Sequence, residues 1–403
     1  MKLAIGGLTE IWESKMLQSV TSTKPSAAQA VIERVRAIIP MFTARATQAE
    51  DARSIPRDSV QELLDAGIAR VLMPLKFGGY ELGMDTWFDI VLEISRVDTS
   101  HGWCASLITH HAHVVAQFPE QAQRTIWANG PDVAIAASIM PTTQVTRADG
   151  GYVISGRQSA FASGVNHCSW AFVGGYLDDD DGQREWTLFL IPREKFSIED
   201  TWLTAGMRGT GSNTIITDNV FVPSAHTLKL ADLRDGCAFG AGNRNPLFQI
   251  PFFYYAPLTF VTPMLGAVQG AYEYYRQWAK ARKSATTASV QIRMARAAAD
   301  LDAAELLLRR GLQLTQAPNW LSPKLLARSV RDFARSAEMV VAAIDTLMSL
   351  CGTAGFAVSN PIQRVWRDVH FASMHVSLNA DNNYGHFGRS EFDLPRDPAQ
   401  PFF

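Results

Sequence analysis

The stretch that decides the fold is GYVISGRQSAFAS at residues 151–163, followed by SWAFVGGYL at 169–177 and EWTLFLIP at 185–192. Each run is short and rich in β-branched and aromatic residues, and Gly, Asp or Asn residues separate the runs, as is typical of strands joined by tight turns. VAIAASIM before these runs and NTIITDNVFVP after them extend the pattern from about Pro131 to Pro223. The centre of the chain is therefore predicted to be a compact antiparallel β domain.

The segments on both sides of this domain have helical periodicity. Before it, AAQAVIERVRAIIPMF and DSVQELLDAGI place apolar residues three or four positions apart, which is the spacing of one helix face. A third helix is predicted over TWFDIVLEISRV and a fourth over HGWCASLITHHAHVVAQF. After it come four runs that are each long enough for one helix of a bundle: PMLGAVQGAYEYYRQWAKARKSA, VQIRMARAAADLDAAELLLRRGLQL, SPKLLARSVRDFARSAEMVVAAIDTLMSL and PIQRVWRDVHFASMHVSLNAD. We therefore expect an α+β protein with a flexible arm, an N-terminal helical domain, a central β domain and a C-terminal helical bundle at residues 1–24, 25–130, 131–240 and 241–403.

Composition narrows the class of protein. The 403 residues are 47% hydrophobic and 19% charged with a net charge of −2, as in an ordinary globular protein with no nucleic-acid or membrane partner. Four scattered cysteines form no CxxC pair and no metal-ligand spacing, which favours a reducing compartment and no metal site. We expect no signal peptide and no membrane span, and hence a cytoplasmic protein. No GxGxxG motif follows a predicted strand, so a Rossmann fold is not expected.

Several short motifs occur in an order that resembles the acyl-CoA dehydrogenase family and its monooxygenase relatives. They are FGGY at 77–80, GYVISG at 151–156 with FASG at 161–164, GMRGTGS at 206–212, and GTAGF at 352–356 with PIQR at 361–364. The resemblance extends from about Ala28 to Arg389. It implies an acyl-CoA dehydrogenase-like fold, with an N-terminal helical domain, a central antiparallel β domain and a C-terminal four-helix bundle.

The chain lacks the carboxylate base that a dehydrogenase would need, and it has histidines in two of its predicted helices. Most acyl-CoA dehydrogenases carry a glutamate base after the last motif, but residues 379–389 read NADNNYGHFGR and contain none. The chain has His110 and His111 in the fourth predicted helix and His375 in the last one. With Arg367-Asp368, these residues resemble the two-component flavin hydroxylases, such as the oxygenase component of 4-hydroxyphenylacetate hydroxylase.

This resemblance implies an enzyme, a flavin monooxygenase active in aromatic catabolism. Such an oxygenase receives FMNH2 or FADH2 from a separate reductase, reacts it with O2 to form a C4a-hydroperoxyflavin, and hydroxylates a small phenolic or indolic compound. The motifs do not separate FMN from FAD. Three alternatives stay open: an acyl-CoA dehydrogenase-type oxidoreductase with a relocated base, a relative that oxidises nitrogen or sulfur, and a non-catalytic scaffold.

On the substrate side, the resemblance assigns three residues. A phenol reacts best as its phenolate, so a base with a pKa near neutrality is useful, and histidine is the natural choice. His111 is implied as that base, with His110 as the competitor. Ser138 is implied to bond the substrate hydroxyl and Trp103 to line the cavity, although a helix-core tryptophan is the alternative.

On the flavin side, the resemblance assigns four residues. Ser163 would lie beside flavin N5, and Phe161 would pack on the ring from the same side, because the two are two positions apart. His375 would face the reacting part of the flavin. Arg282 would reach a flavin phosphate, often across a subunit boundary in a homotetramer. The simpler alternatives are a turn serine, a strand-core phenylalanine, a buried structural histidine and an exposed helix arginine.

Overall fold

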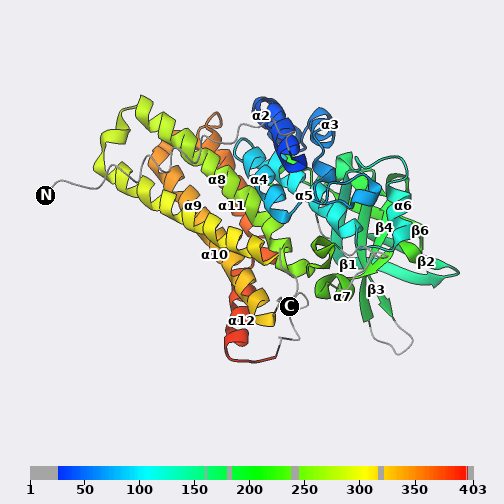
Figure 1. Cartoon of the computed structure of the whole chain (residues 1–403). Coiled ribbons are helices and arrows are strands. Elements are labelled where there is room, and N and C mark those ends of the chain that lie inside the picture. Colours follow the sequence, from blue (N-terminus) through cyan, green and yellow to red (C-terminus); the bar gives the residue numbers. More distant parts are fainter. Residues whose placement is uncertain are drawn as a thin grey trace.

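The computed structural model describes residues 26–158, 161–178, 184–236, 245–315, 322–395 and 397. The expected arm at 1–24 therefore lies outside the described residues. Helices come first, then strands, then helices again. In Figure 1 the sheet occupies one end of the molecule and the long C-terminal helices the other, with the N-terminal helices between them.

The N-terminal region consists of helices, of which one is wholly buried. They are α2 (Ala27–Ala52), α3 (Arg57–Asp65), α4 (Met84–Ser95), α5 (Thr99–Val115) and α6 (Glu120–Ile126). Asp98 caps α5 by accepting a hydrogen bond from the backbone amide of His101, as the first turn of a helix requires. Every residue of α5 is buried, because the helix contacts α4, strand β1 (Ile135–Ala148) and the C-terminal helix α8 (Ala256–Ala281). The side chains of α5 therefore lie in the interior of the protein on every side of the helix.

The sheet has the strand order β5-β6-β2-β1-β3-β4-β7. Besides β1, its strands are β2 (Gly151–Arg157), β3 (Trp170–Asp178), β4 (Arg184–Pro192), β5 (Ser197–Glu199), β6 (Thr214–Pro223) and β7 (Thr227–Lys229). Among the described strand pairs, β1 and β3 are parallel and the others are antiparallel. The prediction of a purely antiparallel domain was wrong at this pair, and the sheet is mixed.

The parallel pairing of β1 with β3 arises because β1 is long enough to pair with two different strands, one along each half. Its register against β3 shifts on both sides of Pro141, because proline cannot donate a ladder hydrogen bond and favours bulges. Up to Thr143 the strand pairs with β3, and from Gln144 onward it pairs with β2. The chain leaves β1 through the β1–β2 hairpin and later returns beside the start of β1.

The C-terminal bundle contains α8, α9 (Ala288–Leu314), α10 (Pro323–Cys351) and α11 (Pro361–Ser373). The last predicted helix was too long, because α11 ends at Ser373 and a 3-10 turn, η12 (Val376–Leu378), leads into α12 (Ala380–Glu391). His375 has extended backbone angles and caps η12 through its side chain. It therefore lies in a turn and not in a bundle helix.

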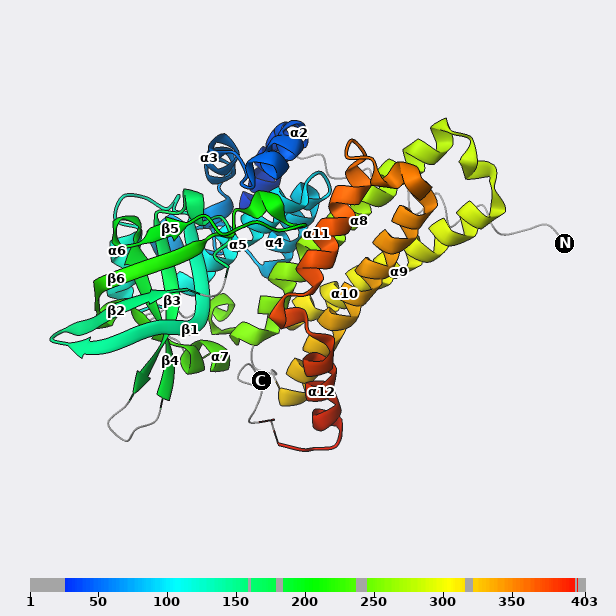
Figure 2. The same ribbon diagram turned by 180° about the vertical axis from the view of Figure 1, so that it is seen from behind.

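Within the described part of the chain, the segment Pro323–Phe356 is long and apolar enough to cross a membrane by length and composition. It consists of α10 and the turn after it. This helix contacts α8, α9, α11 and α12, and Figure 2 shows it running alongside α9 and α11. One face of α10, which includes Phe333, Val340 and Leu347, is fully buried, as expected for the core helix of a bundle.

Candidate functional site

A cavity of about 450 Å³ lies between α5, the sheet and the turn after α11. Ligand pockets of small-molecule enzymes commonly have volumes of about 300–1,000 Å³. The described residues that line it are mostly apolar and include no Lys, Arg, Asp or Glu. Six of the seven predicted site residues line this one cavity: Trp103, His111, Ser138, Phe161, Ser163 and His375.

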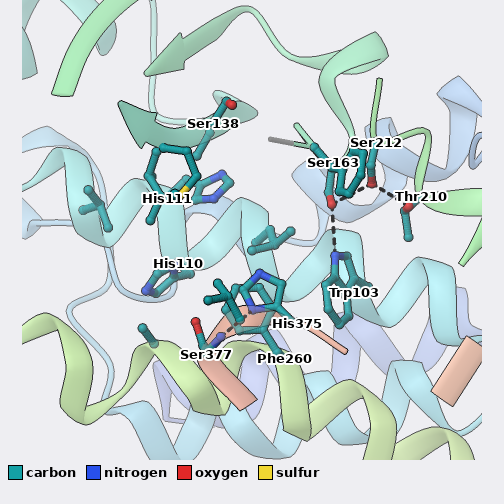
Figure 3. Close-up of a pocket in the computed structure, with 18 of the residues that line it drawn as sticks. Trp103, His110, His111, Ser138, Ser163, Thr210, Ser212, Phe260, His375 and Ser377 are labelled. Carbon is teal, nitrogen blue, oxygen red and sulfur yellow. Dashed lines mark hydrogen bonds between the residues drawn. The ribbon is translucent and has the colours of Figure 1, made fainter. Parts of the chain in front are cut away.

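Figure 3 shows how the polar groups divide around the cavity. His111 and Ser138 lie on one side, and Ser163 with its hydrogen-bond partners lies on the other. His375 and Phe260 lie between these two groups. We call the first side the His111 end and the second the Ser163 end.

His111 is held by the start of the sheet. Its Nδ1 lies 2.6 Å from the carbonyl oxygen of Ile135, and a carbonyl can only accept, so Nδ1 carries the proton and Nε2 carries a lone pair. Burial lowers the pKa of His111 to about 4, because the charged ring loses its hydration. The expected near-neutral pKa is therefore not found, and His111 is a neutral imidazole whose Nε2 can accept.

His375 has the opposite tautomer. Its Nδ1 accepts a hydrogen bond of 3.2 Å from the backbone amide of Ser377, so its proton is on Nε2. The ring stacks on Phe260 with 3.6 Å between the ring centres. Burial lowers the pKa of His375 to about 4, which makes it a neutral donor. His111 thus offers the cavity an acceptor, and His375 offers it a donor.

A chain of hydroxyl groups forms the Ser163 end. Trp103 Nε1 donates to Ser163 Oγ over 3.1 Å, and Ser163 Oγ lies 2.8 Å from Ser212 Oγ. Ser212 Oγ in turn lies 2.7 Å from Thr210 Oγ1, and Thr210 donates to the carbonyl of Met207 over 2.9 Å. Ser163 lies in a turn, as the simpler alternative had it, and these contacts also place its hydroxyl within a hydrogen-bond network.

Sequence reasoning missed Thr210 and Ser212. Both belong to the GMRGTGS motif, which served only as a family marker. The backbone has positive φ at Met207 (55°) and at Gly211 (54°), so the loop bends sharply on both sides of η5 (Arg208–Thr210) and turns these hydroxyls toward Ser163. Two hydroxyl residues in a glycine-rich loop were the available signal.

Phe161 is 60% exposed, so the interpretation as a strand-core residue is wrong. It lies outside the strands, since β2 ends at Arg157. Its ring meets Trp202 edge-on with 5.0 Å between the ring centres, and Trp202 packs in the same way on Phe371. All three line the cavity, and the last two were not predicted. They form an aromatic wall at the Ser163 end.

His110 also lines the cavity but is less firmly held than His111. Within the described residues its Nε2 is buried without a hydrogen-bond partner, and its ring packs against Tyr255 and Phe252. Burial lowers its pKa well below the usual value, and the neighbouring His111 and His113 add to the effect. His113 bonds the Tyr255 hydroxyl and the Leu247 carbonyl, so it has a structural role.

Arg282 is the predicted residue that the structure does not bring to the others. It caps the C-terminal end of α8, and its guanidinium lies over Trp278 at 4.3 Å. Phe260, near the start of the same helix, lines the cavity. A helix of 26 residues spans about 39 Å, so Arg282 is distant from the cavity of its own chain.

Comparisons with known proteins identify the family. The model of the acyl-CoA dehydrogenase N-terminal domain matches residues 26–130, and that of the C-terminal domain matches residues 258–380. Both matches fall on the helical regions that flank the sheet.

In the described part of the chain, no group of three or more His, Cys, Asp or Glu could hold a metal ion.

Two relatives and one solved structure are informative. The chain is 33% identical over 377 residues to the oxygenase subunit HsaA of a flavin-dependent monooxygenase from Rhodococcus jostii, covering 90% of this chain and 98% of the relative. It is 32% identical to the oxygenase component of the FADH(2)-dependent resorcinol hydroxylase from Rhizobium sp., covering 89% and 92%. The crystal structure of 3-HSA hydroxylase from Rhodococcus sp. RHA1 superposes with a TM-score of 0.86 at 33% identity, covering 91% and 98%. The chain therefore belongs to the acyl-CoA dehydrogenase family, among its flavin-dependent monooxygenase oxygenase subunits.

Proposed function

We propose that this chain is the oxygenase component of a two-component flavin-dependent monooxygenase that hydroxylates a small phenolic or indolic compound. The observation that carries this proposal is the cavity itself. It joins an acceptor, His111, with a donor, His375, and with an ordered hydroxyl network, inside an apolar lining. The relatives named for resorcinol hydroxylation and for flavin-dependent oxygenation support it.

The residues at the Ser163 end fit a flavin ring. Such a ring is flat and has a polar edge, and this end offers the aromatic wall of Phe161, Trp202 and Phe371 next to the Ser163 hydroxyl. We assign the wall to the ring face and Ser163 to the N5 edge. When bound, reduced flavin supplies the electrons that activate O2 for transfer of one oxygen atom to the substrate.

His111 is the substrate acceptor in this proposal. With Nδ1 bound to the Ile135 carbonyl, its Nε2 accepts the substrate O–H or N–H and fixes which edge of the aromatic ring faces the flavin. A phenolate formed there would raise the pKa of His111, because an opposite charge favours the imidazolium. His110 lacks such an anchor, and we therefore prefer His111. Ser138 and Trp103 complete the substrate contacts.

His375 donates from Nε2 at the middle of the cavity. Its stacking on Phe260 and its bond from Ser377 fix the ring plane, so the donor is oriented before a ligand arrives. The apolar lining excludes water, which would otherwise divert activated oxygen into hydrogen peroxide.

The flavin phosphate needs a cation that the described lining does not contain. We propose that Arg282 of another copy supplies it, in a homotetramer. Exposed apolar side chains on the C-terminal region, among them Phe356, Met374 and Phe392, are suited to such contacts. We further propose the domain division at residues 25–130, 131–240 and 241–403, a separate flavin reductase as partner and a cytoplasmic location.

The test is a coupled assay. The purified chain is mixed with a flavin reductase, NAD(P)H, FMN or FAD, and a panel of phenols and indoles, while O2 uptake, product and hydrogen peroxide are measured. We expect product in proportion to NAD(P)H for some of the panel, and hydrogen peroxide without an aromatic. Desaturation of an acyl-CoA, or no hydroxylated product from any member of the panel beyond a control without the chain, would contradict the proposal.

A further inference from the structure

The direction of the hydrogen bonds along the hydroxyl chain can be worked out. Each hydroxyl has a single proton, a carbonyl oxygen only accepts, and an indole N–H only donates. Thr210 Oγ1 lies 2.9 Å from the Met207 carbonyl oxygen and must donate to it. Thr210 therefore has no proton left for Ser212.

The remaining directions follow from this first one. Ser212 donates to Thr210 over 2.7 Å, and Ser163 then donates to Ser212 over 2.8 Å. Trp103 Nε1 donates to Ser163 Oγ from the other side. The proton of Ser163 is thus directed away from the cavity, and Ser163 offers the cavity a lone pair.

The surroundings resist a reversal of the chain. Thr210 and Ser212 are each 1% exposed, so bulk solvent has little access to their hydroxyl groups. The loop is fastened at Met207, whose amide donates to Asp368 Oδ1 over 2.6 Å and whose carbonyl also accepts from Trp202 Nε1 over 2.8 Å. In the reversed chain Thr210 would give up its bond to Met207, so that arrangement has one hydrogen bond fewer.

We propose that Thr210 and Ser212 are positioning residues that hold Ser163 as a hydrogen-bond acceptor and thereby make this site prefer reduced over oxidised flavin. The inference rests on the proposed function, which sets Ser163 at the N5 edge. N5 bears a hydrogen in reduced flavin and a bare lone pair in oxidised flavin. An acceptor matches the reduced form and meets the oxidised form lone pair to lone pair.

The test compares binding of the two redox forms. Dissociation constants for reduced and oxidised FMN are measured anaerobically for the parent chain, Ser212→Ala and Thr210→Val, together with the midpoint potential of the bound flavin. We expect the parent to bind reduced FMN more tightly. In either variant the proton of Ser163 can turn to the cavity, so the preference should fall about fivefold, as for one net hydrogen bond. For a two-electron couple this lowers the midpoint potential by about 20 mV.

Two controls separate the chain of hydroxyls from general disturbance. Thr210→Ser keeps the hydroxyl and should keep the preference. Thr201→Val removes a hydroxyl from the neighbouring pair of Thr201 and Thr214, 2.9 Å apart, and should also keep it. The two test variants change different residues, so misfolding of one leaves the other to decide.

The possible results separate failure of the hydroxyl chain's role from failure of the proposed function. A parent chain that prefers reduced FMN, with the preference unchanged in both Ser212→Ala and Thr210→Val, overturns the role of the hydroxyl chain and leaves the proposed function standing. Equal affinity of the parent chain for reduced and oxidised FMN also overturns the role of the hydroxyl chain. A parent chain that binds no flavin at all overturns the proposed function and this inference together.

Discussion

The two ends of the cavity are built in different ways. At the His111 end, a single bond from the imidazole to the Ile135 carbonyl sets the acceptor, within walls of apolar side chains. At the Ser163 end, consecutive hydrogen bonds connect Trp103 to the backbone of Met207. In the proposed arrangement, this difference lets the His111 end accept aromatic substrates of different shapes, while the Ser163 end holds the same flavin ring in every turnover.

Replacing His111 should give the largest separation between the two ends. In His111→Ala the substrate loses its acceptor, and we expect product formation to fall about 100-fold, the usual scale for a lost acid–base group. Affinity for reduced FMN should stay the same, because the His111 end does not touch the flavin in the proposed arrangement. Rapid-quench product analysis and anaerobic titration measure the two quantities. A parallel loss of flavin affinity would show that the ends are not independent.

Arg282 tests whether the cofactor end continues into another subunit. We expect Arg282→Ala to weaken FMN binding about tenfold, as for the loss of a hydrogen bond to a charged group. Riboflavin, which has no phosphate, serves as the matched ligand and should bind equally well to both proteins. Sedimentation shows whether the assembly persists. Equal weakening for FMN and riboflavin would place the phosphate elsewhere.

Ser163→Ala should damage the cofactor end selectively. Without the acceptor, activated oxygen should be lost more readily, and we expect the yield of hydrogen peroxide per NAD(P)H to rise about fivefold, the scale of one net hydrogen bond. Substrate affinity, measured by equilibrium dialysis, should not change. A change confined to substrate affinity would assign Ser163 to the opposite end.

The smallest expected effect concerns Asp368, which fastens the loop of the Ser163 end. Burial raises the pKa of this carboxyl from its usual value of 3.8 to about 7. Between these two values the native state holds a proton that the unfolded chain has released, so the free energy of unfolding contributed by Asp368 falls as the pH rises from about 4 to about 7 and is constant above.

Asp368→Asn removes this proton and keeps an oxygen acceptor for Met207 N–H. Between pH 5 and pH 8 we expect the fall in melting temperature to be a few degrees smaller in the variant than in the parent, as measured by differential scanning calorimetry. The buried histidines act in the opposite direction below pH 6.5 and are present in both proteins. Asp218→Asn changes an exposed carboxyl on β6; it is the control and should behave like the parent. Identical pH dependence in Asp368→Asn and the parent would contradict the assigned burial effect.

The sequence predicted what depends on local pattern and on ordered motifs. Helices, strands and their order follow from periodicity, and the location of Trp103, His111 and Ser163 in one cavity follows from the resemblance. The parallel pairing of β1 with β3 was not predictable, because it joins segments that are distant along the chain. The end of α11 at Ser373 was missed as well, since no Gly or Pro marks it.

The contacts that define the Ser163 end were out of reach for a different reason. Ser163 and Ser212 are 49 positions apart, and although the hydroxyl residues of the GMRGTGS loop could be singled out, their local sequence does not indicate that they meet Ser163. Phe161 was expected to be near the flavin, but its 60% exposure follows from the chain leaving the strand at Arg157. Arg282 lies apart from the other predicted residues, at the end of α8, because the flavin that it is proposed to bind would belong to a neighbouring copy.

Because α5 is completely buried, its residues are poor positions at which to alter the range of substrates that this enzyme accepts. Side chains on that helix are packed on all sides, so exchanging one of them disturbs the interior and seldom yields a new activity. The cavity is also lined by Leu230 and Leu233 on the short helix α7 (Leu230–Asp235) and by Phe252 and Phe253 on the one-turn helix η8 (Phe252–Tyr254). Because these elements are brief, a library randomised at those four positions is the place to look for oxidation of bulkier or slimmer rings.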